Sequence, residues 1–410
     1  MLPKIALGNV RKSLRDFSVF FITLVLGVCV FYAFASINDQ TAVIDLNELQ
    51  SEAVATVTRM LSGVSVFVAV ILGFLVVYAN RFLVRRRKRE FGIYLTLGMG
   101  RAQVAAIIRG EDSRKLLVIG PCSADREDSV LDYTTRLAKL AEDVRDRLVI
   151  VPRVYTAKPR TKGTGYKGLL HNPDPDAAGD VLEGVKAIRH MHLAVAENTG
   201  FFTADEMLYP SNFQYLFDIL SYVAVGARSV ENQEHRLVAS GVSVPVGMKN
   251  PTAGSTTVML NSIYAAQAPQ EFIYRNWEVE TQGNPLAHAI LRGYIGLDGR
   301  NYPNYHYEHL ERLAERYTAE NYANPAVIVD CNHDNSGKRP FEQFRICKEV
   351  LDSCRRNESI RGLVKGFMVE SYLEDGNQPV DGGAYGKSIT DACIGWDKTE
   401  YLIRELAERA

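Results

Sequence analysis

Three hydrophobic runs of this sequence end in side chains that can bind a metal ion: Cys122, His333 and Glu370. A fourth such side chain, Asp391, lies in the loop after the last of these runs. In a closed barrel of parallel strands, reactive side chains gather where the strands end. If the runs are the first, seventh and eighth strands, closure of the ring makes them neighbours. Thiolate, imidazole and carboxylate ligands together favour Mn²⁺, Fe²⁺, Co²⁺ or Zn²⁺ over Mg²⁺ or Ca²⁺. A buried cysteine near ordinary loop acids is the alternative that the spacing alone leaves open.

The other predicted strand ends carry basic side chains: Arg153, Lys158, Arg160, Arg228, Lys249 and Arg292. Any one of them could be ordinary surface charge. Six cations at one end of a barrel, however, repel one another unless their ligands are anionic. Arginine binds a phosphate or a carboxylate through two hydrogen bonds, whereas lysine supplies a point charge. The mixture therefore predicts ligands with more than one phosphate and a carboxylate.

Short runs rich in Val and Ile alternate with helical patterns from residue 112 onward. The nine strand candidates are 116–121, 148–155, 202–206, 222–227, 244–249, 271–275, 286–292, 326–332 and 364–369. Such alternation over ~300 residues is typical of an α/β barrel or a doubly wound sheet. Nine candidates are one too many for a barrel, so we assign 271–275 to an extra hairpin and predict a (β/α)8 TIM barrel.

Composition and charge narrow the function classes. The chain has 410 residues, 47% hydrophobic and 23% charged, as in folded proteins. Residues 1–108 hold 12 Lys/Arg and 6 Asp/Glu, a net charge of +6, whereas the remainder holds 35 and 42, a net charge of −7. The acidic part has no basic stripe with interleaved aromatic residues, so a nucleic-acid partner is not expected. Six cysteines without a C-x-x-C pair favour a reducing compartment.

Two stretches near the N-terminus, 17–38 and 60–80, contain no charged residue. Each is as long as the roughly 20 apolar residues that cross a bilayer. Basic residues flank the outer ends of the pair and acidic residues lie between the stretches, which places both ends in the cytoplasm. We predict a two-helix transmembrane hairpin ahead of the barrel. A pair of buried core helices is the alternative.

The segments ALGNVRKS at 6–13 and REFGIYLTLGM at 89–99 resemble the first hundred residues of an FtsX-like ABC-transporter permease. The resemblance stops near Ile108. It predicts a permease-like N-terminal fragment, 1–108, and a barrel domain, 109–410. The further spans of such permeases do not follow, so a working permease is not expected. The fusion could be selected or accidental.

Seven segments beyond residue 111 follow one another in a recognisable order: GPCS at 120–123, KPRT at 158–161, GARS at 226–229, PVGMKN at 245–250, ILRG at 290–293, MVES at 368–371 and GKSITDACIGW at 386–396. Together they resemble the class I 3-deoxy-7-phosphoheptulonate (DAHP) synthases. The resemblance implies condensation of phosphoenolpyruvate with erythrose 4-phosphate and water, which gives 3-deoxy-D-arabino-heptulosonate 7-phosphate and phosphate at the entry of the shikimate pathway. C3 of phosphoenolpyruvate would attack the aldehyde carbon, with Lewis-acid assistance from a divalent metal.

The same resemblance implies a role for each candidate residue. The metal ligands would be Cys122, His333, Glu370 and Asp391. Phosphoenolpyruvate would be held by Arg153, Lys158, Glu206 (as a supporting carboxylate), Arg228, Lys249 and Arg292. The aldose phosphate would be held by Lys158, Arg160 and Thr161. The predicted catalytic residues are Lys158 and His333; neighbouring cations should lower the pKa of Lys158, which would suit an acid.

The remaining expectations concern partners, location and alternatives. A homo-oligomer is expected through the barrel, and the hairpin would hold the catalytic domain at the cytoplasmic face of the plasma membrane. Without that segment, or if it is an artefact, the enzyme would be cytoplasmic. One alternative is a membrane transport or signalling subunit related to FtsX-like permeases that carries an inactive barrel. Another is the sister enzyme that makes 3-deoxy-octulosonate 8-phosphate, whose corresponding loop is not KPRT.

Overall fold

The computed structural model describes residues 100–160, 163–174 and 177–410, together with a few isolated positions between residues 25 and 74. The chain forms two compact units, Met1–Gly92 and Ile93–Ala410. The predicted hairpin stretches, 17–38 and 60–80, lie almost entirely outside the described residues, so the hairpin stays a prediction. Among the residues that the structure does describe, no helix is both long enough and apolar enough to cross a bilayer.

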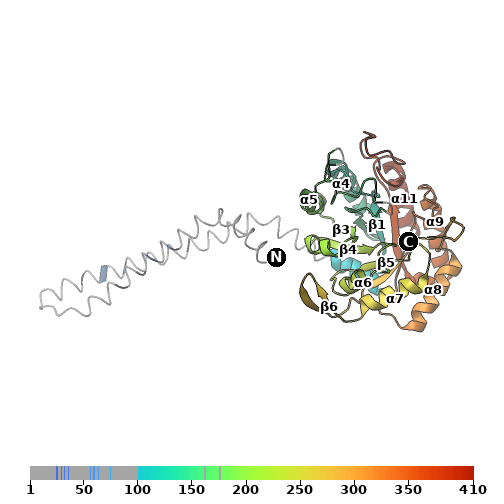
Figure 1. Ribbon diagram of the computed structural model, residues 1–410, viewed down its shortest axis with the longest axis horizontal. Helices are drawn as coiled ribbons and strands as arrows, with labels where there is room; N and C mark the ends of the chain where they lie inside the picture. Colours follow the sequence, from blue (N-terminus) through green and yellow to red (C-terminus); the bar gives the residue numbers. More distant parts are fainter. Residues whose placement is uncertain are drawn as a thin grey trace. The chain divides into compact units, whose positions relative to one another are not determined.

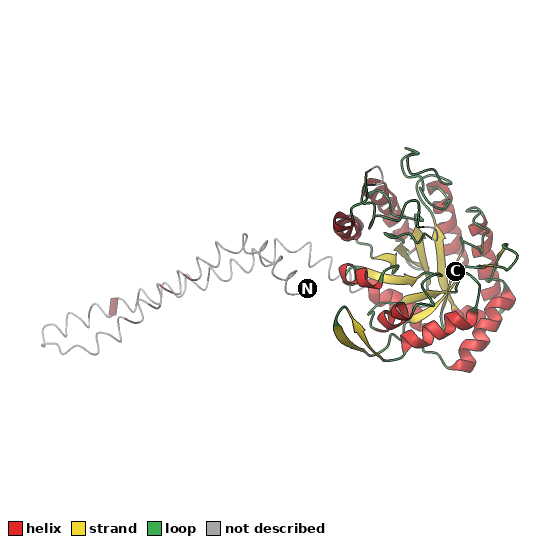
Figure 2. Cartoon of the chain, in the orientation of Figure 1, coloured by secondary structure: helices red, strands yellow, loops and turns green. Residues whose placement is uncertain are grey.

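Eight parallel strands form the centre of the second unit (Figures 1 and 2). They are β1 (Lys115–Gly120), β2 (Leu148–Pro152), β3 (Thr203–Glu206), β4 (Leu220–Val225), β5 (Val246–Lys249), β8 (Ala287–Leu291), β11 (Val327–Asp330) and β12 (Val364–Glu370). Their order is β2-β1-β12-β11-β8-β5-β4-β3. A parallel bridge between Arg153 and Ala204, just beyond β2, joins the two ends of this order. The predicted (β/α)8 barrel is confirmed.

Helices surround the strands, as Figure 2 shows. They are α4 (Glu127–Val144), α5 (Val181–Thr199), α6 (Gln233–Ser240), α7 (Thr256–Gln267), α8 (Tyr307–Glu320), α9 (Glu342–Arg356), α10 (Glu358–Leu363) and α11 (Trp396–Arg409), with a 3-10 helix, η1 (Pro210–Tyr215). Their apolar residues recur every three or four positions; in α4 the buried ones include Val130, Tyr133, Leu137 and Leu140. This spacing gives each helix one apolar face for the barrel.

The strands are hydrophobic on both faces because both faces are covered. In β1, Leu117 and Ile119 belong to the outer cluster that packs against the helices. The alternate residues Leu116 and Val118 belong to a separate cluster inside the ring. The interior of the barrel is thus a packed and mainly apolar core.

Two antiparallel pairs lie outside the barrel: β6 (Gln270–Tyr274) with β7 (Trp277–Thr281), and β9 (Tyr294–Ile295) with β10 (Asn301–Tyr302). The β6–β7 turn places Arg275 and Asn276 at φ 55° and 67°. Two consecutive positive φ values are typical of the tight turns that join hairpin strands. The assignment of 271–275 to an extra hairpin is confirmed.

The helical residues 100–109 cover the N-terminal end of the barrel. Val104 and Ile107 are fully buried and share the interior cluster with Leu116. Arg101 Nε donates to the backbone oxygen of Leu220, the first residue of β4, at 2.8 Å. Although these residues precede the predicted boundary at residue 109, they pack as part of the barrel.

A neutral histidine lies inside the barrel. His288 of β8 is fully buried, and its Nε2 lies 2.8 Å from the hydroxyl of Tyr222. Its Nδ1 lies 2.8 Å from the backbone oxygen of Leu286. Room for Tyr222 depends on Gly247, where an added Cβ would lie 2.3 Å from the tyrosine hydroxyl. Burial lowers the pKa of His288 to about 4.

Acidification is therefore expected to destabilise the barrel through His288. In the unfolded chain this residue binds a proton near pH 6.5, but in the folded chain only near pH 4. Between these values the unfolded state binds more protons, so the free energy of unfolding falls as the pH decreases. The loss through this residue amounts to about 2 kcal/mol at pH 5. Urea unfolding at pH 7 and pH 5 measures it. His288→Gln should show a flatter dependence; an equally steep one would assign the loss to other groups.

Candidate active site

A pocket of about 120 Å³ opens at the C-terminal ends of the strands. It is lined by all six predicted cations, Arg153, Lys158, Arg160, Arg228, Lys249 and Arg292, and also by Cys122, Glu206, His333 and Asp391. Glu370 ends β12 and is buried beside them. Thr161 lies outside the described residues. The barrel therefore brings the described candidates to one place.

Closure of the ring brings three of the predicted metal ligands together. β1 pairs with β12 in a register that sets Gly120 beside Glu370, and Cys122 follows two residues later. One ligand atom each from Cys122, Glu370 and Asp391 lies within 4.8 Å of the others. The sulfur of Cys122 is 3.4 Å from Asp391 Oδ2. The neighbourhood expected from the order of the strands is present.

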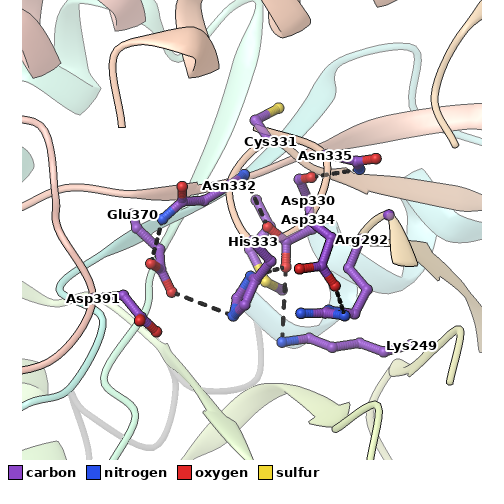
Figure 3. A network of polar contacts seen from close by, with 12 residues as sticks. Lys249, Arg292, Asp330, Cys331, Asn332, His333, Asp334, Asn335, Glu370 and Asp391 are labelled. Carbon is purple, nitrogen blue, oxygen red and sulfur yellow. Dashed lines mark hydrogen bonds and ion pairs between the residues drawn. The ribbon is translucent and has the colours of Figure 1, made fainter. Parts of the chain in front are cut away.

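His333 lies next to this cluster, between two carboxylates (Figure 3). Its Nε2 is 3.8 Å from Glu370 Oε1, and its Nδ1 is 2.8 Å from Asp330 Oδ2. The backbone of His333 is left-handed, with φ 46°, which is uncommon for a residue other than glycine and is found at functional sites. With Nδ1 directed at Asp330, Nε2 is the nitrogen that faces the cluster.

Lys158 contacts two of the predicted ligands. Its Nζ lies 2.7 Å from the sulfur of Cys122 and 2.8 Å from Asp391 Oδ2. Burial alone would lower the pKa of Lys158, but Cys122 and Asp391 raise it above its ordinary value. The expectation that neighbouring cations lower this pKa is wrong, because the groups nearest to Nζ are acidic.

The donor set fits a divalent cation. Burial, and next the charge of Glu370, raises the pKa of Cys122 to about 11. Burial would also raise the pKa of Glu370, but Arg153 and His333 lower it. Glu370 Oε1 is buried and forms no hydrogen bond of good geometry among the described residues, although Arg153 Nη2 is 2.9 Å away. A metal ion would satisfy this buried oxygen, which lies beside a thiol and a second carboxylate that can also bind the ion.

The inner cations are buried and each has an acidic partner. Arg153 pairs with Glu370, and its guanidinium carbon lies 3.9 Å from the centre of the Tyr155 ring. Lys249 Nζ is 3.2 Å from Glu206 Oε2. Arg292 pairs with Asp334. Such partners hold a buried charge in place until an anionic ligand binds.

The outer cations are more accessible. Arg160 is partly buried, and its Nε donates to the backbone oxygen of Tyr166 at 2.7 Å. Arg228, in the loop after β4, is exposed. The pocket thus combines a dry inner group of charges with a wetter outer group, which suits two anionic ligands bound at different depths.

Residues 93–404 match the family model described as the DAHP synthetase I family. The chain belongs to this family. The enzyme class predicted from the sequence, 3-deoxy-7-phosphoheptulonate synthase, is confirmed. A second model, described as FtsX-like permease C-terminal, matches residues 62–111 and so overlaps part of the predicted permease-like fragment, 1–108.

Relatives with known names extend over most of the DAHP synthetase part. The Phe-sensitive phospho-2-dehydro-3-deoxyheptonate aldolase of Escherichia coli K12 is 40% identical over 321 residues, which cover 76% of this chain and 88% of that protein. The Tyr-sensitive enzyme of Salmonella typhimurium is 40% identical over 320 residues, which cover 76% of this chain and 86% of that protein. The solved structure of the aldolase from Francisella tularensis SCHU S4 is 30% identical, with a TM-score of 0.72, and the match covers 80% of this chain and 95% of that one.

The residues predicted from the sequence do not include Asp330, Tyr155 or Lys338, which the structure places in or beside this pocket. Asp330 contacts His333 and also lies 3.8 Å from Lys249 Nζ. It ends a hydrophobic run, so the rule that found the other residues applies to it as well. Tyr155 and Lys338 line the pocket, and Lys338 Nζ lies 4.0 Å from Asp391 Oδ1. The strand candidate 148–155 ends at Tyr155, so the same rule applies to it, whereas no spacing in the sequence distinguishes Lys338 from an ordinary loop residue.

Asp330→Asn is expected to weaken metal binding about 10–100-fold, because carboxylates that orient a metal-binding histidine have effects of this size. Calorimetric titration of Mn²⁺ into chelator-treated protein measures the affinity. Asp334→Asn is the matched control, since Asp334 is equally buried but pairs with Arg292. Wild-type affinity in Asp330→Asn would show that Asp330 does not orient His333.

Proposed function

We propose that this pocket is the active site of the DAHP synthase activity. In it, phosphoenolpyruvate, erythrose 4-phosphate and water react to give 3-deoxy-D-arabino-heptulosonate 7-phosphate and phosphate, the first step of the shikimate pathway. The observation that supports this assignment is the juxtaposition of a metal-type cluster, Cys122, Glu370 and Asp391, with six cations in one pocket. One substrate carries a phosphate and a carboxylate, the other a phosphate and an aldehyde. The cations match the first three groups.

Cys122, His333, Glu370 and Asp391 would hold the metal. A bound Mn²⁺, Fe²⁺, Co²⁺ or Zn²⁺ supplies Lewis-acid assistance at the aldehyde. The inner cations Arg153, Lys249 and Arg292, with Arg228, hold phosphoenolpyruvate, and Glu206 keeps Lys249 in place. Arg160 and Thr161 hold the aldose phosphate. Fixing both substrates in one pocket supplies proximity and preorganised charge.

Lys158 is the group that we propose to handle the proton at the aldehyde. The raised pKa keeps its Nζ protonated at neutral pH. C3 of phosphoenolpyruvate bonds to the aldehyde carbon, and the aldehyde oxygen takes a proton as it becomes a hydroxyl. Lys158 Nζ lies against Cys122 and Asp391, where it can donate that proton. Water then adds at C2, and one of its protons restores the charge of Lys158. The C2–O bond to phosphate breaks, phosphate leaves with the bridging oxygen and the second proton, and C2 becomes the ketone carbonyl.

We propose that residues 1–108 include a permease-like fragment that attaches the barrel to the cytoplasmic face of the plasma membrane, and that the barrels associate as homo-oligomers. The alternative is an inactive barrel on a transport or signalling subunit. It is not favoured, because each predicted position has a side chain suited to its role and the described ones lie at one pocket.

Removal of the metal is expected to abolish activity. Chelator-treated protein should release no phosphate from the two substrates, and Mn²⁺, Fe²⁺ or Co²⁺ should restore release, because proton donation by Lys158 alone would not replace the Lewis acid that polarises the aldehyde. His333→Ala should lose bound metal and rate together; metal content by mass spectrometry checks the first. Full activity in excess chelator would refute the metal role.

The two anion positions are expected to respond to different substitutions. Loss of a charge-assisted contact costs about 1.5–3 kcal/mol, or roughly 10–100-fold in affinity. Arg160→Ala should raise KM mainly for erythrose 4-phosphate, and Arg228→Ala mainly for phosphoenolpyruvate. Steady-state kinetics with each substrate varied in turn measures both. Equal effects on the two substrates in both variants would contradict separate positions.

A further inference from the structure

A buried carboxylate that plays no part in the proposed chemistry lies directly beneath the pocket. Asp205, in β3, is 3% exposed. Its Oδ1 accepts hydrogen bonds from the backbone N–H groups of Thr156, at 3.0 Å, and Glu206, at 2.7 Å. Its Oδ2 accepts one from Thr156 Oγ1 and lies 3.3 Å from Nε2 of the buried His192. One side chain therefore engages four groups.

Thr156 begins the segment that carries two pocket cations, Lys158 and Arg160. Residues 166–170 hold the same segment from the other side. Lys158 N donates to the backbone oxygen of Lys167 at 3.0 Å, and Leu170 N donates to that of Thr156 at 3.1 Å. Gly168 permits this approach, since an added Cβ would lie 2.5 Å from the Thr156 oxygen. The segment is held by polar contacts on both sides.

A small cavity limits the packing of the segment on the Asp205 side. A cavity of about 30 Å³ lies there, lined by Thr156, Ala157, Asp205 and Glu206 together with apolar side chains of α5, η1 and β4. Atoms next to such a cavity lack neighbours on one side, so dispersion contacts hold them less firmly. On this side, the position of the segment therefore depends on the hydrogen bonds to Asp205.

We infer that Asp205 is a positioning residue that fixes the Lys158–Arg160 segment relative to Glu206. Its Oδ1 joins the backbone that leads to Lys158 and Arg160 to the backbone of Glu206, whose side chain holds Lys249. It thereby sets the position of the aldose phosphate relative to phosphoenolpyruvate. This inference rests on the proposed function, which assigns those two ligands. On the other side of His192 from Asp205, Nδ1 lies 2.7 Å from Thr203 Oγ1.

Two substitutions at Thr156 test the inference with little change of volume. Thr156→Val removes the hydroxyl that reaches Asp205, and Thr156→Ser restores it. We expect Thr156→Val to raise KM for erythrose 4-phosphate about five- to tenfold, the size of one lost hydrogen bond, and Thr156→Ser to return it to within about twofold of wild type.

The matched control is Thr203→Val, which removes a buried hydroxyl from the far side of His192 without touching the segment. It should lose as much thermal stability as Thr156→Val and leave KM unchanged. Hydrogen exchange of the peptide 154–170 gives a readout that does not depend on activity. The amides of Thr156 and Lys158 should exchange faster in Thr156→Val than in Thr203→Val.

Substitution of Asp205 itself separates geometry from charge. In Asp205→Asn one oxygen can still accept the two backbone N–H groups, while the amide donates to the Thr156 hydroxyl and to the other tautomer of His192. The KM of Asp205→Asn for erythrose 4-phosphate should therefore stay within about threefold of the wild-type value. Asp205→Ala should raise this KM more than Thr156→Val does. Equal losses in Asn and Ala would overturn a role in positioning.

The variants Arg160→Ala and Thr156→Val together distinguish the role of Asp205 from the assignment of the aldose phosphate. If Arg160→Ala raises KM for erythrose 4-phosphate but Thr156→Val changes neither KM nor exchange, Asp205 does not position the segment. If Arg160→Ala itself leaves that KM unchanged, the assignment of the aldose phosphate is wrong. In that case, faster exchange in Thr156→Val would still support the hold of Asp205 on the segment.

Discussion

The position of β12 between β1 and β11 is the constraint on which the site depends. It sets Glu370 beside the end of β1, so that Cys122 and Asp391 meet it although 269 positions separate them in the chain. It also places the loop of His333 against the same carboxylate. In a parallel sheet all strands end on the same side, so closure of the ring is what turns separate strand ends into one pocket.

A second constraint is charge balance in a dry pocket. Arg153, Lys158, Lys249 and Arg292 each have an acidic partner, supplied by Glu370, Asp391, Glu206 and Asp334. An unpaired buried charge would cost several kcal/mol. The acids hold the cations apart and aimed at the pocket, where phosphate and carboxylate groups can share them. The ion pairs are therefore stable without a ligand, and their cations can still bind an anionic ligand.

The matches to the two family models share part of the chain. The family matches 62–111 and 93–404 overlap, and the helical residues 100–109 lie within the overlap. An apolar face with Val104, Ile107 and Ile108 suits either context. In this structure the barrel uses that face to cover its N-terminal end, where Ile107 packs with Leu116. The barrel thus depends on residues ahead of the predicted boundary at 109.

The sequence by itself determined the eight strands, the extra hairpin and the enzyme class. Runs of Val and Ile buried on both faces mark barrel strands, and the residue that follows each run faces the pocket. Only the tertiary structure decided what lies next to each charge. Lys158 was expected among cations, yet its nearest groups are Cys122 and Asp391, so its pKa moves the opposite way. The link between Asp205 and Thr156 also became visible only in the fold, because it joins residues 49 positions apart. Periodicity follows from local backbone geometry, whereas electrostatic surroundings depend on distances across strands that no local pattern records.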